Sequence, residues 1–345
     1  MRRKKALIFP YDISCVHMII NRNMILEYEI SHVVSLKSWG YCDKDAGAHL
    51  KVHTGVNVSD DFETALAKVD TVIITDTIIP LDNSLMQMYR ERAIHAGKEV
   101  LDSRSFAEKP FAYKNSLADG GIPQINDIDK PLVVVVGTGT NTGKFDTQLY
   151  VRKIFLDEGY KVSQIGSKPN CNLWGFHGFP QFMIGKNSGA EKILMFNQYV
   201  NYIASAEDPD IIIIGVPGGI VPISNKVYDD FGLMNYMVSN AVKPDYVILN
   251  TGFVDYNKSY IETMTEAVKN RFDYEVDSVF LSNFCINWEV TDVLNRLVYM
   301  TLPLDVVNQD AKECGCYSLY CEEDADCFKK NMLSTLEGYS NIDVM

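Results

Sequence analysis

The hydrophobic positions of the first 125 residues form short runs that alternate with amphipathic stretches. Buried strands are predicted at 5–11, 31–36, 70–76 and 98–103. Helices are predicted at 14–24, 59–69 and 82–97, the second opening on the capping residues Ser59-Asp60-Asp61 and the third ending at Gly97. Alternation of strands and helices predicts a parallel sheet covered by helices.

A second alternating pattern follows a proline- and glycine-containing stretch at 108–130, which is typical of a linker. Strands are predicted at 132–137, 160–166, 210–216, 245–251 and 278–282. Helices are predicted at 145–158, 231–242 and 258–271, and the long region between 166 and 210 receives no assignment. From about residue 306 the chain is cysteine-rich and acidic. The sequence therefore predicts two α/β domains and a tail.

The loop after the strand 132–137 has the composition of a phosphate-binding loop. It consists of Gly137, Thr138, Gly139, Thr140, Asn141, Thr142, Gly143 and Lys144. Glycines let the backbone N–H groups surround an anion, the following helix adds its positive end, and the lysine supplies a mobile charge. Five residues separate Gly137 from the Gly143-Lys144 pair, one more than the usual four between the glycines. We interpret the loop as a nucleotide phosphate site rather than a plain glycine turn.

The first predicted strand, 5–11, is not followed by a glycine-rich phosphate-binding loop. It runs into Pro10-Tyr11-Asp12 and has no G-x-G-x-x-G, so a dinucleotide site is not expected in this half of the chain. The domain organisation is therefore predicted as a Rossmann-like domain without dinucleotide fingerprint over 1–125, a P-loop nucleotide-binding domain over 131–305, and a tail over 306–345.

Composition and net charge indicate which classes of partner and which cellular location to expect. A chain of 345 residues with 47% hydrophobic and 22% charged residues is typical of a soluble protein of about two domains. A net charge of −13 argues against nucleic acid, and no apolar run approaches the ~20 residues that span a bilayer. No signal peptide is recognisable, so a cytoplasmic location and reduced cysteines are expected, with no membrane partner.

Four segments resemble dethiobiotin synthetase and the related cobyrinate amide synthases. They are the loop 137–144, Lys168-Pro169, the segment 211–223 and the segment 247–257. The resemblance implies a P-loop NTPase-like fold and use of ATP with Mg²⁺ to phosphorylate a carboxylate or carbamate, which an amine or ammonia then attacks. It implies catalytic roles for Lys144 and Lys168.

Further nucleotide-binding candidates follow from the same resemblance. They are Thr147 on the helix, Gly218 and Gly219 at the cleft, and Asn257 near the base. Dethiobiotin synthetase-like enzymes are homodimers, so a homodimer is expected by analogy.

The two-domain layout resembles the D-glutamate N-acetyltransferase-like family, and the whole chain resembles peptide-maturation system proteins of clostridial natural-product clusters. That resemblance implies maturation of a ribosomally synthesised peptide, with a precursor peptide and a maturation enzyme as partners. It assigns no chemical step, so the chemistry must come from the residues.

The chain departs from the P-loop pattern at both magnesium anchors. Phe145 stands where a hydroxyl residue would hold the ion, and Gly215, Val216 and Pro217 stand where an acidic residue is expected. Replacement ligands are sought in Asp146, Asp210, Asp229 and Asp230. These departures affect phosphoryl transfer more than nucleotide binding, because backbone groups and Lys144 carry most of the binding.

Two further groups of residues allow several interpretations. The segment 170–180 follows a strand end and contains Cys171 and His177, which are catalytic candidates or structural residues. The tail places Cys314, Cys316, Cys321 and Cys327 in a C-x-C-x4-C-x5-C spacing. These four thiols are candidates for a zinc or iron–sulfur site, for redox pairs, or for incidental cysteines of a mobile tail.

Three functions remain open at this point. The first is an ATP-utilising enzyme that activates a carboxylate during peptide maturation. The second is a non-catalytic, nucleotide-gated protein that presents a peptide to a partner. The third is an acyltransferase whose loop holds the phosphates of a coenzyme A-like donor.

Overall fold

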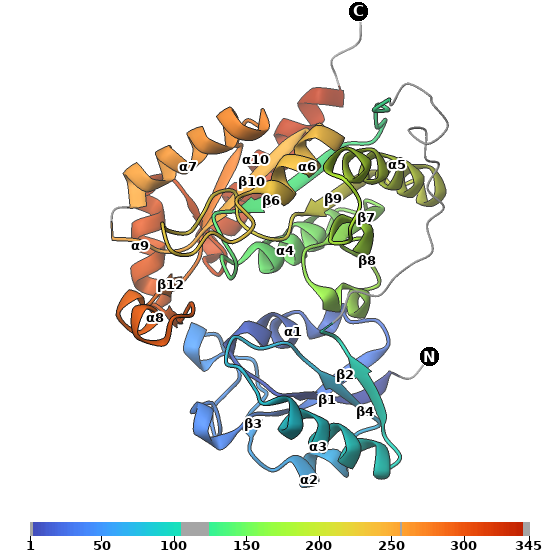
Figure 1. Cartoon of the computed structure of the whole chain (residues 1–345), viewed down its shortest axis with the longest axis vertical. Helices are drawn as coiled ribbons and strands as arrows, with labels where there is room; N and C mark the ends of the chain where they lie inside the picture. Colours follow the sequence, from blue (N-terminus) through green and yellow to red (C-terminus); the bar gives the residue numbers. More distant parts are fainter. Residues whose placement is uncertain (1–2, 105–123, 256, 341–345) are drawn as a thin grey trace, which may run out of the picture. The chain divides into compact units, whose positions relative to one another are not determined.

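A computed structural model describes residues 3–104, 124–255 and 257–340, which form an α/β protein with parallel sheets (Figure 1). The chain divides into two compact units. Unit 1 comprises Met1–Ala107, Pro169–Gly175 and Ile286–Pro303, and unit 2 comprises Glu108–Lys168, Phe176–Cys285 and Leu304–Met345. The predicted linker 108–130 lies largely outside the described residues.

Unit 1 contains a five-stranded sheet in the order β3-β2-β1-β4-β5, with every pair parallel. This is the doubly wound order 3-2-1-4-5-6 without its sixth strand. The strands are β1 (Lys4–Phe9), β2 (Tyr28–Val34), β3 (Val58–Ser59), β4 (Thr71–Ile74) and β5 (Glu99–Asp102). The helices are α1 (Val16–Ile20), α2 (Phe62–Leu66) and α3 (Asn83–His95).

The strands of unit 1 form because short apolar runs are buried between helices. Phe9 packs against Phe62 of α2 and Tyr89 of α3 at ring-centroid distances of 5.0 and 4.4 Å. Asp61 caps α2 by accepting from the Thr64 N–H, as the capping pattern of the sequence predicts.

The helix predicted at 14–24 is instead three short pieces. Ile13–Cys15 and Arg22–Met24 are 3₁₀ helices on either side of α1. Where α1 ends, the His17 carbonyl accepts both from the Asn21 N–H at 3.0 Å and from the Asn21 side-chain amide at 3.1 Å.

Unit 2 contains a seven-stranded sheet in the order β14-β11-β10-β6-β9-β7-β8, and its pairs are parallel. Its strands are β6 (Leu132–Gly137), β7 (Val162–Gly166), β8 (His177–Gly178), β9 (Ile211–Gly215), β10 (Tyr246–Thr251), β11 (Ser278–Leu281) and β14 (Tyr317–Ser318). The central strands β6, β9 and β10 are buried throughout, because helices cover both faces of a parallel sheet.

Two layers of helices cover this sheet. The helices are α4 (Lys144–Asp157), α5 (Gly189–Glu207), α6 (Leu233–Ala241), α7 (Asn257–Phe272), α9 (Leu304–Cys314) and α10 (Glu322–Ser340). α4 and α10 share a hydrophobic cluster with the sheet, which includes Val151, Phe155 and Phe328. α5, α6 and α7 pack side by side (Figure 1). A separate two-stranded sheet pairs β12 (Phe284–Ile286) with β13 (Tyr299–Thr301), and α8 (Trp288–Leu294) connects them.

Two further parts of the structure differ from the sequence-based expectation. The unassigned region after residue 166 contains α5, whose N-terminus carries a capping box formed by Ser188 and Glu191. The expected tail belongs to unit 2, because β14 adds a strand to the sheet and Phe328 and Met332 of α10 are fully buried. Among the described residues no helix is long and apolar enough to cross a membrane.

Candidate functional site

The loop 138–143 connects β6 to α4 at the carboxyl end of the sheet. The Thr138 N–H donates to the Asn250 carbonyl at 2.9 Å, which ties the loop to β10. A Cβ on Gly137 would lie 2.5 Å from Oγ1 of Thr142 and 2.8 Å from Cδ of Lys144, so only glycine fits there. Gly143 has a φ of +79°, a left-handed conformation that glycine tolerates best. Gly137 and Gly143 of the motif are therefore required by the loop itself.

Lys144 folds back over this loop. Its ammonium donates to the Gly139 carbonyl, and its side chain is only 7% exposed. Burial lowers the pKa of Lys144 to about 8, while the negative charges of Asp229 and Asp230 act to raise the pKa. An ammonium held by a backbone carbonyl and poorly solvated is placed to pair with an anion.

The segment between β9 and α6 packs directly against the loop. The Ile220 N–H donates to the Gly137 carbonyl at 2.9 Å. A Cβ on Gly219 would lie 3.0 Å from the Thr138 carbonyl oxygen and 3.2 Å from a carboxylate oxygen of Asp229. The structure thus brings the predicted pair Gly218 and Gly219 to the loop, with acidic residues beside them.

Phe145 is part of the core rather than the site. Its side chain is 2% exposed and its ring lies 6.2 Å from that of Phe176. The nearest hydroxyl on the same helix, Thr147, is buried and accepts from the Asn250 side-chain amide at 2.7 Å. Phe145 has no hydroxyl, and Thr147, a nucleotide-binding candidate in the sequence analysis, supports β10 in this structure through its hydrogen bond with Asn250.

Lys168 lies at the same end of the sheet, just beyond β7. Its ammonium is 5.9 Å from the ring centroid of Phe145, and its charge acts on Lys144 and Asp146. The preceding residue, Ser167, is held by two hydrogen bonds with the buried side chain of Gln148. The two lysines singled out in the sequence therefore converge on one region of unit 2.

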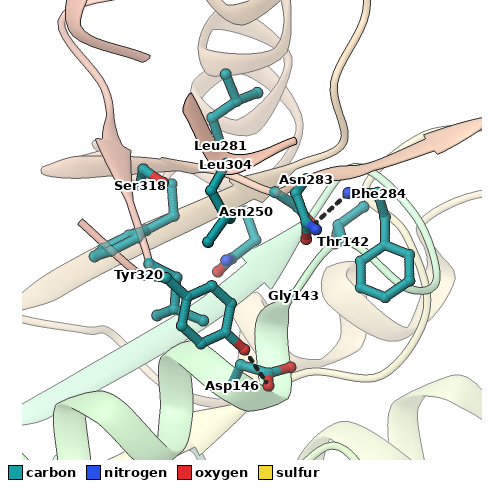
Figure 2. Close-up of a pocket in the computed structure, with 13 residues that line it drawn as sticks. Thr142, Gly143, Asp146, Asn250, Leu281, Asn283, Phe284, Leu304, Ser318 and Tyr320 are labelled. Atoms are coloured by element: carbon teal, nitrogen blue, oxygen red, sulfur yellow. Dashed lines mark hydrogen bonds between the residues drawn. The ribbon is translucent and has the colours of Figure 1, made fainter. Parts of the chain in front are cut away.

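A pocket of about 350 Å³, including the part open to solvent, adjoins the loop. It lies where the carboxyl ends of β10, β11 and β14 meet the start of α4 and α9 (Figure 2). Its lining residues are Thr142, Gly143, Asp146, Asn250, Phe280, Leu281, Ser282, Asn283, Phe284, Leu304, Ser318, Leu319 and Tyr320. A concave site at the carboxyl ends of parallel strands is where open α/β sheets bind ligands.

Polar atoms of this pocket are buried without a partner. They are Oδ1 of Asn250, whose side chain is 2% exposed, and Nδ2 of Asn283, whose side chain is 5% exposed. Buried polar atoms nearly always have a hydrogen-bond partner, so an unpartnered acceptor and donor in one cavity indicate that a ligand or water completes them. Tyr320 donates to Asp146 at 3.1 Å across the same pocket (Figure 2).

Two predicted site residues, Asp210 and Asn257, lie outside this pocket. Asp210 directly precedes β9, at the amino-terminal end of the strands, and accepts from the Lys161 N–H at 2.7 Å. The loop lies at the carboxyl end, so Asp210 is not a metal ligand there. Asn257 accepts from the Val254 N–H and donates to Asp310, and it does not line the pocket.

Of the interpretations left open for the tail cysteines, the described part of the chain does not support a metal site. No group of three or more His, Cys, Asp or Glu side chains there could hold a metal ion. Cys316 is buried beside β14, whereas Cys327 is exposed on α10, and all four tail cysteines are free thiols. The four cysteines are close in sequence but do not form one cluster, because β14 and the first turn of α10 lie between them.

The segment 170–180 is divided between the units. Cys171 belongs to unit 1 and is fully buried. His177, in unit 2, lies on the edge strand β8 and its Nε2 is 2.7 Å from a carboxylate oxygen of Glu207. The second oxygen of Glu207 accepts from Ser163.

Sequence reasoning did not single out Asn250, Ser282, Asn283 or Tyr320. For the first three a signal exists, because each is a polar residue at the end of a buried apolar strand, in "YVILNT" and "SVFLSN". Tyr320 offers no such signal, since β14 has two residues and pairs with β11 far away in sequence.

No protein-family model and no curated protein matches this sequence. A solved structure of a DUF1611 family protein from Anabaena variabilis matches with a TM-score of 0.57 at 12% identity, covering 97% of this chain and 100% of that chain. At this identity the match shows a shared fold and nothing further.

Partial matches concern smaller parts of the chain. The hydrogenase maturation factor HypB from Archaeoglobus fulgidus covers 60% of this chain and 90% of its own, with 13% identity and a TM-score of 0.33. A nucleotide-binding protein in complex with ADP from the same organism covers 60% of this chain and 88% of its own, with 13% identity and a TM-score of 0.31. Scores this low carry no argument about this chain.

Proposed function

We propose that unit 2 binds ATP and uses it to activate a carboxylate for attack by an amine. The observation that carries this proposal is the loop 137–144 with the buried ammonium of Lys144 at its centre, next to the pocket that Thr142 and Gly143 border. Backbone N–H groups and the N-terminus of α4 would hold the phosphates. Lys168 would orient the γ-phosphate and the acceptor carboxylate.

The residues present fit a magnesium ion only through carboxylates. Magnesium at a nucleotide commonly uses one or two carboxylates, phosphate oxygens and water. Asp230 accepts from the N–H groups of Gly232 and Met234 and so fixes the start of α6. Asp229 lies beside Gly219 and within the electrostatic reach of Lys144, and it would hold the ion. Bound there, Mg²⁺ would neutralise charge on the outer phosphates.

A nucleotide-gated, non-catalytic role is the second candidate. The observation that favours it is the burial of Phe145 in the position that usually supplies a magnesium ligand. Binding would then move Lys144 off the Gly139 carbonyl and change the loop without chemistry.

Titration calorimetry of the full chain with ATP and Mg²⁺, and separately with coenzyme A, tests the proposed function. Binding of ATP followed by ADP release in the presence of a carboxylate and an amine supports the enzyme. Tight ATP binding without ADP release supports the gate. Binding of coenzyme A in place of ATP contradicts both.

Replacing Lys168 with alanine is expected to lower kcat for ADP release about 100-fold, because a misplaced acceptor costs about that factor. The Kd for ATP should change little, since Lys144 and the loop carry the phosphate contacts. Steady-state kinetics with calorimetry measures both quantities. Lys161→Ala, at the opposite end of β7, is the matched control and should leave kcat unchanged. Equal activity of both variants would remove Lys168 from the mechanism.

Nucleotide binding near pH 8 is expected to take up about half a proton, because the pKa of Lys144 is about 8 without ligand and phosphate anions raise it. Calorimetry in two buffers of different ionisation enthalpy measures the uptake. Lys144→Arg, which stays charged, should show no proton uptake.

The same low pKa should affect stability. Since the unfolded lysine titrates near 10.5, the unfolded chain binds more protons between about pH 8 and 10.5. The unfolding free energy of the unliganded protein should therefore rise across that window.

We further propose a precursor peptide as the acceptor and a homodimer as the working form. Both rest on the sequence resemblances described above. Sedimentation of the purified chain, with and without ATP, tests the dimer, and ATP-dependent modification of a candidate precursor peptide tests the acceptor.

A further inference from the structure

The pocket next to the phosphate-binding loop has an acidic end. Thr142 and Gly143 of the loop form its border, and Asp146 follows from the first turn of α4, two residues after Lys144. In any nucleotide the ribose joins the phosphates to the base. If the phosphates occupy the loop, the group that reaches this end of the pocket first is therefore the ribose.

Asp146 is held in place from the opposite wall. The Tyr320 hydroxyl donates to Oδ1 of Asp146 at 3.1 Å, and Tyr320 follows directly on β14 (Figure 2). Burial raises the pKa of Asp146, while the charge of Lys168 and the Tyr320 hydroxyl act to lower it. A carboxylate accepts up to about four hydrogen bonds, so Tyr320 uses only part of its capacity.

A carboxylate this close to a phosphate site is unfavourable for phosphate itself. Like charges repel, and the repulsion is strong where solvent is scarce. Hydroxyl groups, in contrast, donate to a carboxylate, and an acidic residue that binds a ribose 2′-OH is a known arrangement in nucleotide-binding α/β folds. The position of Asp146 is thus suited to a sugar diol and unsuited to a phosphorylated sugar.

We propose that Asp146 accepts hydrogen bonds from the ribose hydroxyls of the bound nucleotide, with Tyr320 as its positioning residue, and so selects a ribonucleotide with a free 2′,3′-diol. This inference rests on the proposed function. The unpartnered Oδ1 of Asn250 and Nδ2 of Asn283 then face the rest of the nucleoside, whose base offers both donors and acceptors. A 3′-phosphorylated ribose, as in coenzyme A, is disfavoured, which distinguishes this site from that of a coenzyme A-dependent acyltransferase.

The test compares the affinities of the full chain for ATP, 2′-deoxy-ATP and adenosine 3′,5′-bisphosphate by calorimetry. The wild type should bind ATP at least about tenfold more tightly than 2′-deoxy-ATP, the value of one hydrogen bond to a charged group. In Asp146→Ala the ratio should fall to about one. Tyr320→Phe should give an intermediate ratio. Asp146→Asn, which removes the charge but keeps the size, should strengthen binding of the bisphosphate.

Asp157→Asn is the matched control, because Asp157 is the exposed acid at the other end of α4 and pairs with Lys153. It should leave all ratios unchanged. Two results would overturn this proposal and leave the proposed function intact. In the first, the wild type binds ATP and 2′-deoxy-ATP with equal affinity. In the second, it prefers ATP and Asp146→Ala does not change that preference. A ratio that depends on Asp146 in Mg²⁺ but not in EDTA assigns Asp146 to the metal and also overturns it. Absence of ATP binding to the wild type overturns both.

Discussion

Replacing Lys144 with alanine is expected to weaken ATP binding about 1,000-fold and to abolish ADP release. The ammonium now donates to the Gly139 carbonyl and, when it turns to the phosphates, would make two charge-assisted hydrogen bonds. Each such bond is worth about 2 kcal/mol, and about 4 kcal/mol corresponds to roughly three powers of ten in Kd. Calorimetric titration of the variant with ATP and Mg²⁺ measures the loss.

The variant should remain folded, because burial opposes the charge on Lys144 and its removal relieves that cost. Lys153→Ala, an exposed lysine on the same helix, is the matched control and should bind ATP as the wild type does. Unchanged affinity in Lys144→Ala would show that the loop is a structural turn and would remove the basis of the proposed function.

Replacing Phe328 with alanine is expected to lower the free energy of unfolding of unit 2 by about 3–5 kcal/mol. Phe328 of α10 is fully buried, and its ring lies 4.8 Å from that of Phe280 on β11 and 5.3 Å from that of Tyr317 on β14. The truncation would leave a cavity between α10 and the sheet that these fixed strands cannot close.

Urea unfolding followed by far-UV circular dichroism measures this loss. All three tryptophans, Trp39, Trp174 and Trp288, belong to unit 1, so tryptophan fluorescence follows the other unit and separates the two transitions. Lys330→Ala, at an exposed position of the same helix, is the control and should change the midpoint little. A midpoint in Phe328→Ala that equals the wild-type value would contradict the assignment of α10 to the core.

The loop and the central strands could be predicted from the sequence because their causes are local. The runs 132–136, 211–214 and 246–249 are apolar throughout, which is typical of strands buried on both faces. The glycines around Lys144 satisfy backbone geometry that can be read over eight residues. A capping box at Ser188 and Glu191 carried an equally local signal for α5, which the sequence analysis missed.

The division of the chain into units could not be predicted in the same way. Pro169–Gly175 and Ile286–Pro303 belong to unit 1 although unit 2 surrounds them in sequence. The expected boundaries at 125–131 and 306 assume that each domain is one continuous segment. Contacts between residues more than a hundred positions apart decide such assignments, and no local pattern records them.

The sequence by itself determined that this protein has parallel α/β layers and a loop able to surround phosphate, since periodicity and glycine placement act over a few residues. Only the tertiary structure decided what stands beside that loop. Strand β14 pairs with β11, and this long-range pairing brings Tyr320 to Asp146 across 174 positions and closes a pocket lined by Asn250 and Asn283. The structure also places Asp210 at the amino-terminal end of β9, opposite the loop, and places the tail in the core. Sheet order decides both, because it fixes which strand ends meet.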